Sequence, residues 1–277
     1  MEEIGILTLS LIIVNGIVTY KGLNDFTFLD KFSFNVHEIL VNKDYKRLIT
    51  SGFLHVDWVH FTFNMLTLYL FSKSLENSIG ILALLILYFA SLIGGNLLAL
   101  YIHRNHPDYT AIGASGAVSG LVFASIGLFP GMELGFILLP IFFPAWLYGI
   151  AYVVYSIYGI KSQRDNIGHE AHLGGGIVGL LIAIVINPNI MVTNTLPIML
   201  ILIPTLTFLF LIIKKPHVLL VKNPFSKSKN VYTVEDKYNS NKTSKQTELD
   251  SILDKINKKG YDKLSKKEKD RLNKLSK

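Results

Sequence analysis

The sequence has little charge and no cysteine. Only 17% of its 277 residues are Asp, Glu, Lys or Arg, and half are apolar, whereas soluble domains usually carry about 25% charged residues. This shortage of charge indicates that most of the chain is dissolved in lipid. The absence of cysteine excludes disulfides, thiolate nucleophiles and cysteine-ligated zinc sites.

The charges that are present are unevenly distributed. From Lys214 onward there are 18 basic and 8 acidic residues, a net charge of +10, whereas residues 1–213 carry 9 basic and 12 acidic residues, a net charge of −3. The basic residues of the tail are not expected to form a groove-sized folded patch interleaved with aromatic residues, which argues against a nucleic-acid partner. The sequence therefore predicts a membrane domain followed by a basic soluble tail.

Seven apolar stretches approach the roughly 20 residues that a membrane-spanning helix needs. They are residues 4–20, 59–71, 79–102, 114–129, 144–160, 171–186 and 196–213. The first is preceded by Glu2 and Glu3 and is followed by no clear cleavage site, which favours a retained span over a signal peptide. The loop at 21–58 mixes aromatic and charged residues, so we expect it to lie at the membrane interface.

The last apolar stretch, 196–213, has two interpretations. Its length favours a seventh span, which would place the tail outside the cytoplasm. The basic residues that follow it, Lys214 and Lys215, oppose this by the positive-inside rule. The alternative is a re-entrant segment with a cytoplasmic tail.

The remaining chain is divided by composition. We predict a membrane core at 1–187, the extra apolar segment at 188–213, a flexible basic linker at 214–247 and a small soluble helical hairpin at 248–277. An amphipathic tail that folds only on a membrane surface or on a partner is an alternative for the last part. The tail is expected to contact anionic lipid or an unknown protein.

Polar residues open three of the predicted spans, although such residues are costly in a membrane. His60 and Asn64 lie four residues apart, on one helix face. Alone, such a pair is more often interfacial or helix-bridging. Ser115 opens the fourth span, where unpaired backbone N–H groups favour the negative charge that develops when a serine attacks a carbonyl.

The same segments also carry small residues. Gly116 and Gly120 form a GxxxG packing element, and Gly175 and Gly179 follow His172 at the start of the sixth span. If the fourth and sixth spans pack together, His172 can reach Ser115 and act as general base and then general acid.

The combination of these motifs resembles the rhomboid family of intramembrane serine proteases, over roughly residues 1–187. The motifs occur in the family's order: His55, His60 and Asn64, then Gly113, Ser115 and Gly116, then His172, Gly175 and Gly179. Arg47 matches the family's Trp-Arg element in the first loop, and Glu76 matches a recurrent structural acid. Lys46 stands where the family's tryptophan is usual, and Ser119 where some members carry a tyrosine that packs against the histidine.

The resemblance implies a role for each matching residue. Ser115 would be the nucleophile and His172 its base, with His60, Asn64 and the Ser115 backbone N–H holding the oxyanion. His55 would be a structural hydrogen-bonding residue, and Gly113 would allow close backbone approach. The implied reaction is hydrolysis of a peptide bond in or beside a transmembrane helix of another membrane protein, without a metal or other cofactor.

The resemblance, together with the apolar pattern and the composition of the tail, predicts a fold and a location. We expect an all-α polytopic membrane protein, with a six-helix rhomboid-like core, a seventh C-terminal span and a small helical tail. It would be a multi-pass protein of the bacterial cytoplasmic membrane, with the active site opening to the non-cytoplasmic side.

Other readings of the polar residues are weaker. Glu170, two residues before His172, points to another side of a helix, and His169 and Asp165 are expected to be loop residues, so a catalytic triad is not predicted. A His-Glu-x-x-His metalloprotease motif is absent from the sequence. An inactive relative that binds transmembrane helices is an alternative function. A small transporter is another, but it would place polar residues in the middle of spans.

Overall fold

The computed structural model describes residues 5–136, 139–162 and 167–214, and single residues of the tail at 252, 255, 256, 265, 269 and 272. The chain divides into two units, Met1–Val221 and Lys222–Lys277. All helices and strands named below belong to the first unit. The predicted linker at 214–247, apart from Lys214, and the predicted hairpin at 248–277, apart from those single residues, lie outside the described residues.

The first part of the chain is a long helix followed by a loop built from short elements. These are α1 (Ile6–Asn24), α2 (Phe26–Phe32), β1 (Phe34–Asn35), α3 (Val36–Leu40), α4 (Arg47–Thr50) and the 3₁₀ helix η1 (Ser51–Phe53). Asp25 and Asn35 cap α2 and α3 by accepting a backbone N–H with their side chains. The interfacial loop that the sequence predicts is therefore an ordered structure.

The rest of the unit is mainly helical. Its elements are α5 (Trp58–His103), β2 (Thr110–Ala111), α6 (Ser115–Leu128), β3 (Glu133–Phe136), β4 (Leu139–Pro144), α7 (Ala145–Ser162), α8 (His169–Ile186), α9 (Ile190–Thr193) and α10 (Thr195–Lys214).

Helix α5 contains two of the predicted spans. It breaks at Gly80, whose φ of 79° and ψ of 165° are not helical and favour glycine. The His60 ring lies 5.0 Å from that of His55, and Asn96 donates to the Leu48 carbonyl at 2.8 Å. Both ends of α5 thus lie beside the first loop. The second predicted span, which ended at residue 71, was too short, because its helix continues to the break.

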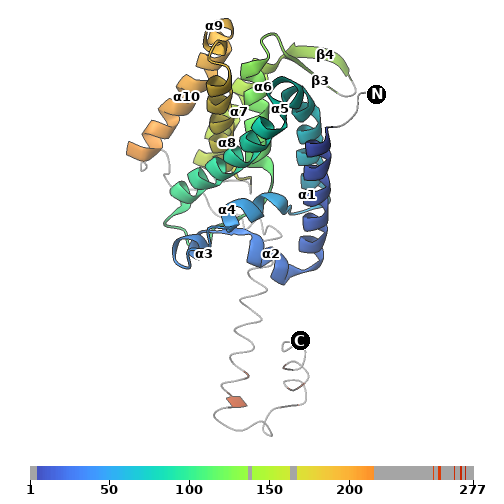
Figure 1. Ribbon diagram of the computed structural model, residues 1–277. Helices are drawn as coiled ribbons and strands as arrows, with labels where there is room; N and C mark the ends of the chain where they lie inside the picture. Colours follow the sequence, from blue (N-terminus) through green and yellow to red (C-terminus); the bar gives the residue numbers. More distant parts are fainter. Residues whose placement is uncertain are drawn as a thin grey trace. The chain divides into compact units, whose positions relative to one another are not determined.

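The helices form a bundle with α6 at its centre (Figure 1). All residues of α6 from Gly116 to Gly127 are buried. In contrast, α1 exposes Ile13 and Ile17, and α10 exposes Leu206 and Phe210. Apolar side chains on an outer helix face are what lipid contact requires.

Length and composition distinguish the helices that could cross a membrane from the shorter ones. Among the described residues, four helices are long and apolar enough to cross a membrane, namely α1, α5, α8 and α10, and α6 is a shorter apolar helix. Without α10, and with the two halves of α5 counted apart and α7 added, the helices of the expected six-helix core are α1, the two halves of α5, α6, α7 and α8. Helix α10 has 20 residues, which is the length that a membrane span needs. It contains Pro204.

A β-hairpin between α6 and α7 was not predicted. Strands β3 and β4 pair antiparallel, with Glu133 opposite Pro144 and Leu134 opposite Phe143. The hairpin lies at the end of the bundle opposite to α2, α3 and α4 (Figure 1). It replaces the short loop expected before residue 144.

Candidate active site

The first turns of α6 and α8 lie in direct backbone contact. A Cβ atom at Gly175 would stand 2.7 Å from the carbonyl carbon of Gly116, and a Cβ at Gly116 would stand 3.3 Å from the carbonyl oxygen of Ala171. Only glycine at position 175 allows this approach. Ser115 immediately precedes Gly116 and His172 immediately follows Ala171, so the structure brings the two segments together.

The His60 imidazole and the Ser115 hydroxyl both lie beside Gly113. Gly113 has a φ of 143°, a conformation that favours glycine. A Cβ there would stand 3.1 Å from Nε2 of His60 and 3.6 Å from Oγ of Ser115. Gly113 therefore lets the imidazole of His60 approach the serine hydroxyl. His60 and Ser115 are both partly buried, so neither is sealed from a substrate.

Asn64 lies one turn further along α5. Its side chain is buried, with 6% exposure, and its Nδ2 donates to the His60 carbonyl at 3.0 Å. The amide has two N–H groups, and this bond uses one of them. Asp57 caps the same helix, because its carboxylate accepts the His60 backbone N–H at 2.7 Å. The start of α5 therefore fixes both His60 and Asn64.

His55 joins three segments behind the serine. Its Nδ1 lies 2.8 Å from Oγ1 of Thr19, and Nε2 accepts a long contact of 3.5 Å from the Ala114 N–H. Burial, and to a smaller extent His60, lower its pKa to about 3, although Asp57 acts in the opposite direction. His55 is thus a neutral imidazole that holds the start of α6.

His172 is in the first turn of α8 and lies against an aromatic ring of α7. Its backbone N–H donates to the Gly168 carbonyl at 3.1 Å. The Tyr152 ring stacks with its imidazole, with centroids 5.8 Å apart and planes inclined by 23°. The Tyr152 hydroxyl lies 2.7 Å from Oγ of Ser119. The sequence did not predict a role for Tyr152.

Glu170 is directed to a different helix. Its Oε1 accepts from Nε2 of His103 at 3.0 Å, and the His103 ring stacks on Tyr109 with centroids 3.6 Å apart. Both members of the pair are buried. This network ties the start of α8 to the end of α5. His103 was missed, and the signal for it was Glu170, an acidic residue at the start of an apolar span, which needs a partner.

His169 was predicted to be a loop residue, and this was wrong. It lies in the first turn of α8 and is 1% exposed, with its ring edge-on to Tyr155. Gly159 of α7 leaves room for this imidazole, because a Cβ at that position would meet the His169 ring. Asp165 lies outside the described residues.

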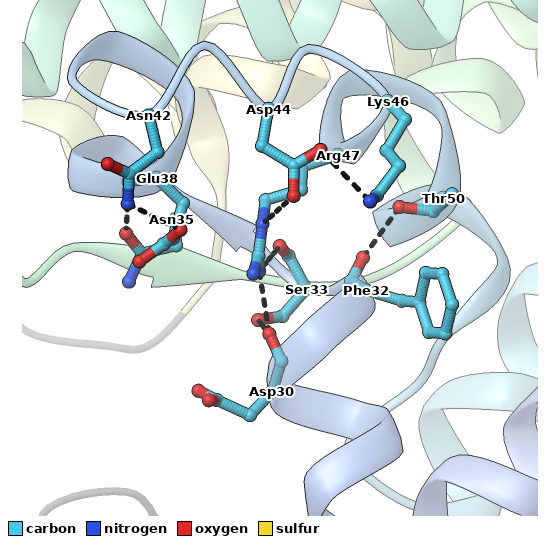
Figure 2. A network of polar contacts seen from close by, with 10 residues as sticks. All are labelled: Asp30, Phe32, Ser33, Asn35, Glu38, Asn42, Asp44, Lys46, Arg47 and Thr50. Carbon is cyan, nitrogen blue, oxygen red and sulfur yellow. Dashed lines mark hydrogen bonds and ion pairs between the residues drawn. The ribbon is translucent and has the colours of Figure 1, made fainter.

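Arg47 organises the first loop (Figure 2). It is 6% exposed, and one terminal nitrogen donates to the carbonyls of Asp30 and Ser33 at 2.6 and 2.8 Å. Its Nε donates to the Asp44 carboxylate at 3.1 Å, and Lys46 pairs with the same carboxylate at 3.3 Å. Lys46 therefore takes part in an ion pair at the surface of this loop.

The loop is fixed in turn to the segment before the serine. Strands β1 and β2 pair Asn35 with Thr110, and the Gly113 N–H donates to the Ser51 carbonyl at 3.0 Å. Glu76 is remote from this region, since its carboxylate packs against Gly5 at the start of α1, where the helix dipole favours negative charge. In the described part of the chain, no three His, Asp or Glu side chains are grouped as metal ligands.

These features define a class of protein. The apolar helices and their outward-facing apolar side chains make the chain an all-α polytopic integral membrane protein, with a serine and a histidine at the starts of two packed central helices.

Residues 42–189, just over half of the chain, match the family model of the Rhomboid domain. The chain belongs to the rhomboid family. Residues 232–277 match a second model, a family of unknown function called DUF6576.

Relatives span organelles and bacteria. The chain is 34% identical over 150 residues to RHOMBOID-like protein 12, mitochondrial, of Arabidopsis thaliana, covering 48% of this chain and 44% of that protein. It is 31% identical over 161 residues to Rhomboid protein 1, mitochondrial, of Saccharomyces cerevisiae, covering 56% and 45%. It is 27% identical over 203 residues to Rhomboid protease AarA of Providencia stuartii, covering 64% and 71%. The chain thus matches less than half the length of the two mitochondrial relatives.

Proposed function

We propose that this chain is an intramembrane serine protease, which hydrolyses peptide bonds in or beside the transmembrane helices of other membrane proteins. The observation that carries the proposal is the contact of Gly116 with Ala171 and Gly175, because Ser115 directly precedes Gly116 and His172 directly follows Ala171 in the chain. Family membership supports the same reaction class, and a bacterial relative is named a protease.

The proposed reaction passes through an acyl-enzyme. Oγ of Ser115 attacks the scissile carbonyl carbon while His172 takes the hydroxyl proton. His172 then gives this proton to the leaving amine as the peptide bond breaks. A water molecule, deprotonated by the same imidazole, hydrolyses the ester and restores Ser115. Both side chains are only partly buried, which is consistent with access for substrate and water.

Charge on the carbonyl oxygen would be stabilised by donors around Ser115. The backbone N–H of Ser115 is in the first turn of α6, where N–H groups have no intrahelical partner and the dipole favours an anion. His60 approaches from the Gly113 side, and Asn64 carries a second amide N–H. Such donors stabilise the tetrahedral oxyanion more than the planar carbonyl.

The site would open to the non-cytoplasmic side of a bacterial cytoplasmic membrane. The first loop, the start of α6 and the start of α8 lie together, and a cytoplasmic N-terminus places that end of the bundle outside. We propose residues 1–187 as the protease core and 188–213 as an added span, followed by a basic linker to residue 247 and a helical hairpin at 248–277. The tail would contact anionic lipid or another protein.

The test is cleavage of a model transmembrane substrate by the full chain in liposomes. Ser115→Ala and His172→Ala are each expected to abolish cleavage. Ser125→Ala, on the same helix as Ser115 and buried, and His37→Ala, exposed on α3, are matched controls that should cleave normally. Cleavage that survives Ser115→Ala would overturn the mechanism. A wild-type chain that binds the substrate without cutting it would favour the helix-binding alternative.

A further inference from the structure

We propose that Tyr152 is the positioning residue that orients the imidazole of His172 toward Ser115, and that Ser119 holds Tyr152 in place. This role rests on the proposed Ser115–His172 chemistry. It assigns to α7 a part in the active site that no sequence motif marks.

The first observation is the ring contact. The Tyr152 and His172 rings are inclined by only 23° with centroids 5.8 Å apart, which is an offset stacked geometry for aromatic pairs. An imidazole on a partly exposed residue can rotate about two side-chain bonds. A ring packed along one of its faces removes most of these orientations, and a general base works only within hydrogen-bond reach of its proton.

The second observation is a chain of hydrogen bonds to the serine. The Ser119 hydroxyl lies 2.7 Å from the Ser115 carbonyl and 2.7 Å from the Tyr152 hydroxyl. A serine hydroxyl has one proton, and the Ser115 carbonyl can only accept it. Tyr152 is therefore the donor to Ser119. The Tyr152 ring thus contacts His172 directly. Its hydroxyl is linked to the Ser115 backbone by way of Ser119.

The third observation is the packing around Tyr152. Its ring is edge-on to Phe123 of α6 with centroids 5.7 Å apart, and Tyr148 of α7 lies at the same distance. Ser119 is 3% exposed, so its hydroxyl is held in the interior of α6. Tyr152 is therefore confined on several sides and can transmit a fixed orientation to His172.

Two kinds of variant separate the ring from the hydroxyl. Tyr152→Leu removes the ring and is expected to lower kcat about tenfold or more, with KM changed less than about twofold, because orientation and not substrate binding is lost. Tyr152→Phe keeps the ring and should restore most of this activity. Tyr158→Leu, exposed on the same helix, is the matched control and should behave like the wild type.

The hydrogen bond is tested by a double-mutant cycle. Tyr152→Phe and Ser119→Ala each remove the same bond, so each is expected to lower kcat by about twofold, much less than Tyr152→Leu does. The double variant should be no worse than either single variant. Losses that multiply would show that the two residues act separately and would overturn the part assigned to Ser119.

A readout that does not depend on activity completes the test. In protein labelled with ¹³C-histidine, the Cε1–H signal of His172, assigned by its loss in His172→Ala, should move in Tyr152→Leu and stay in place in Tyr158→Leu. An unmoved signal, or wild-type kcat in Tyr152→Leu, would overturn the proposal. Failure of the wild type to cleave, or cleavage by Ser115→Ala, would refute the protease function instead. In that case the Cε1–H signal of His172 would still show whether Tyr152 orients its imidazole.

Discussion

Gly175 of α8 lies so close to Gly116 of α6 that an added Cβ would stand 3.0 Å from the Gly116 Cα and closer still to its carbonyl group. The neighbour is backbone, which cannot rotate away as a side chain can. Replacement of this glycine therefore separates the two helices that hold Ser115 and His172.

Gly175→Ala should lower both stability and cleavage. Overpacking of this kind costs about 1–3 kcal/mol, and separation of the helices would move His172 away from Ser115. Thermal unfolding in detergent and the liposome assay measure the two effects. Gly16→Ala is the matched control, because its Cβ would stand 3.6 Å from the Phe61 ring. Equal behaviour of the two variants would contradict the close helix contact.

The stability of the fold should depend on pH through His55. Its pKa is about 3 in the fold against 6.5 for an ordinary histidine, so the unfolded chain binds the proton more tightly. The contribution of His55 is complete above pH 6.5 and is lost as the pH falls from there toward 3, by up to about 1.4 kcal/mol per pH unit.

The measurement compares the unfolding free energy of the wild type with that of His55→Gln across this range. The variant is expected to have a smaller slope, because one titrating group is missing. Identical slopes would show that His55 is not held neutral.

The buried pair of His103 and Glu170 should stabilise the start of α8. Glu170→Ala leaves the imidazole of His103 without its carboxylate, and an unsatisfied buried polar group costs about 1–3 kcal/mol. Glu133→Ala, exposed on the hairpin, should cost little. In the double variant with His103→Ala the losses should not add, whereas additive losses would mean that the pair is not coupled.

The side of the membrane that the tail occupies is accessible to labelling, because the chain has no cysteine. Val41→Cys places a thiol on the first loop, where the side chain is exposed, and Lys277→Cys places one at the end of the tail. If α10 crosses the membrane, an impermeant maleimide labels both from the same side. Labelling from opposite sides would show that α10 does not cross.

Much of the fold was predictable, as were the helices that carry the proposed site residues, because both depend on local patterns. Apolar stretches of membrane length and polar residues at their ends indicated the helices that carry Ser115, His172, His60 and Asn64. The break of α5 at a single residue, Gly80, was harder to place, because residues 72–78 are mostly polar and yet the helix continues through them.

Contacts between segments that are distant in the sequence could not be predicted from local patterns. Tyr152 lies among several tyrosines of α7, and only the packing of α7 against α8 selects it as the neighbour of His172. The pairing of Glu170 with His103 joins residues 67 positions apart. The hairpin at β3 and β4 was missed because apolar residues around it resemble the start of a span.

The most direct test of the proposed mechanism is covalent capture of the nucleophile. A fluorophosphonate, whose fluoride is displaced by an activated serine oxygen, is incubated with the full chain in liposomes, and the modified residue is located by mass spectrometry. We expect the adduct on Ser115, and we expect it to form far more slowly in His172→Ala. An adduct on a different serine, or equal rates with and without His172, would contradict the assignment of the two residues.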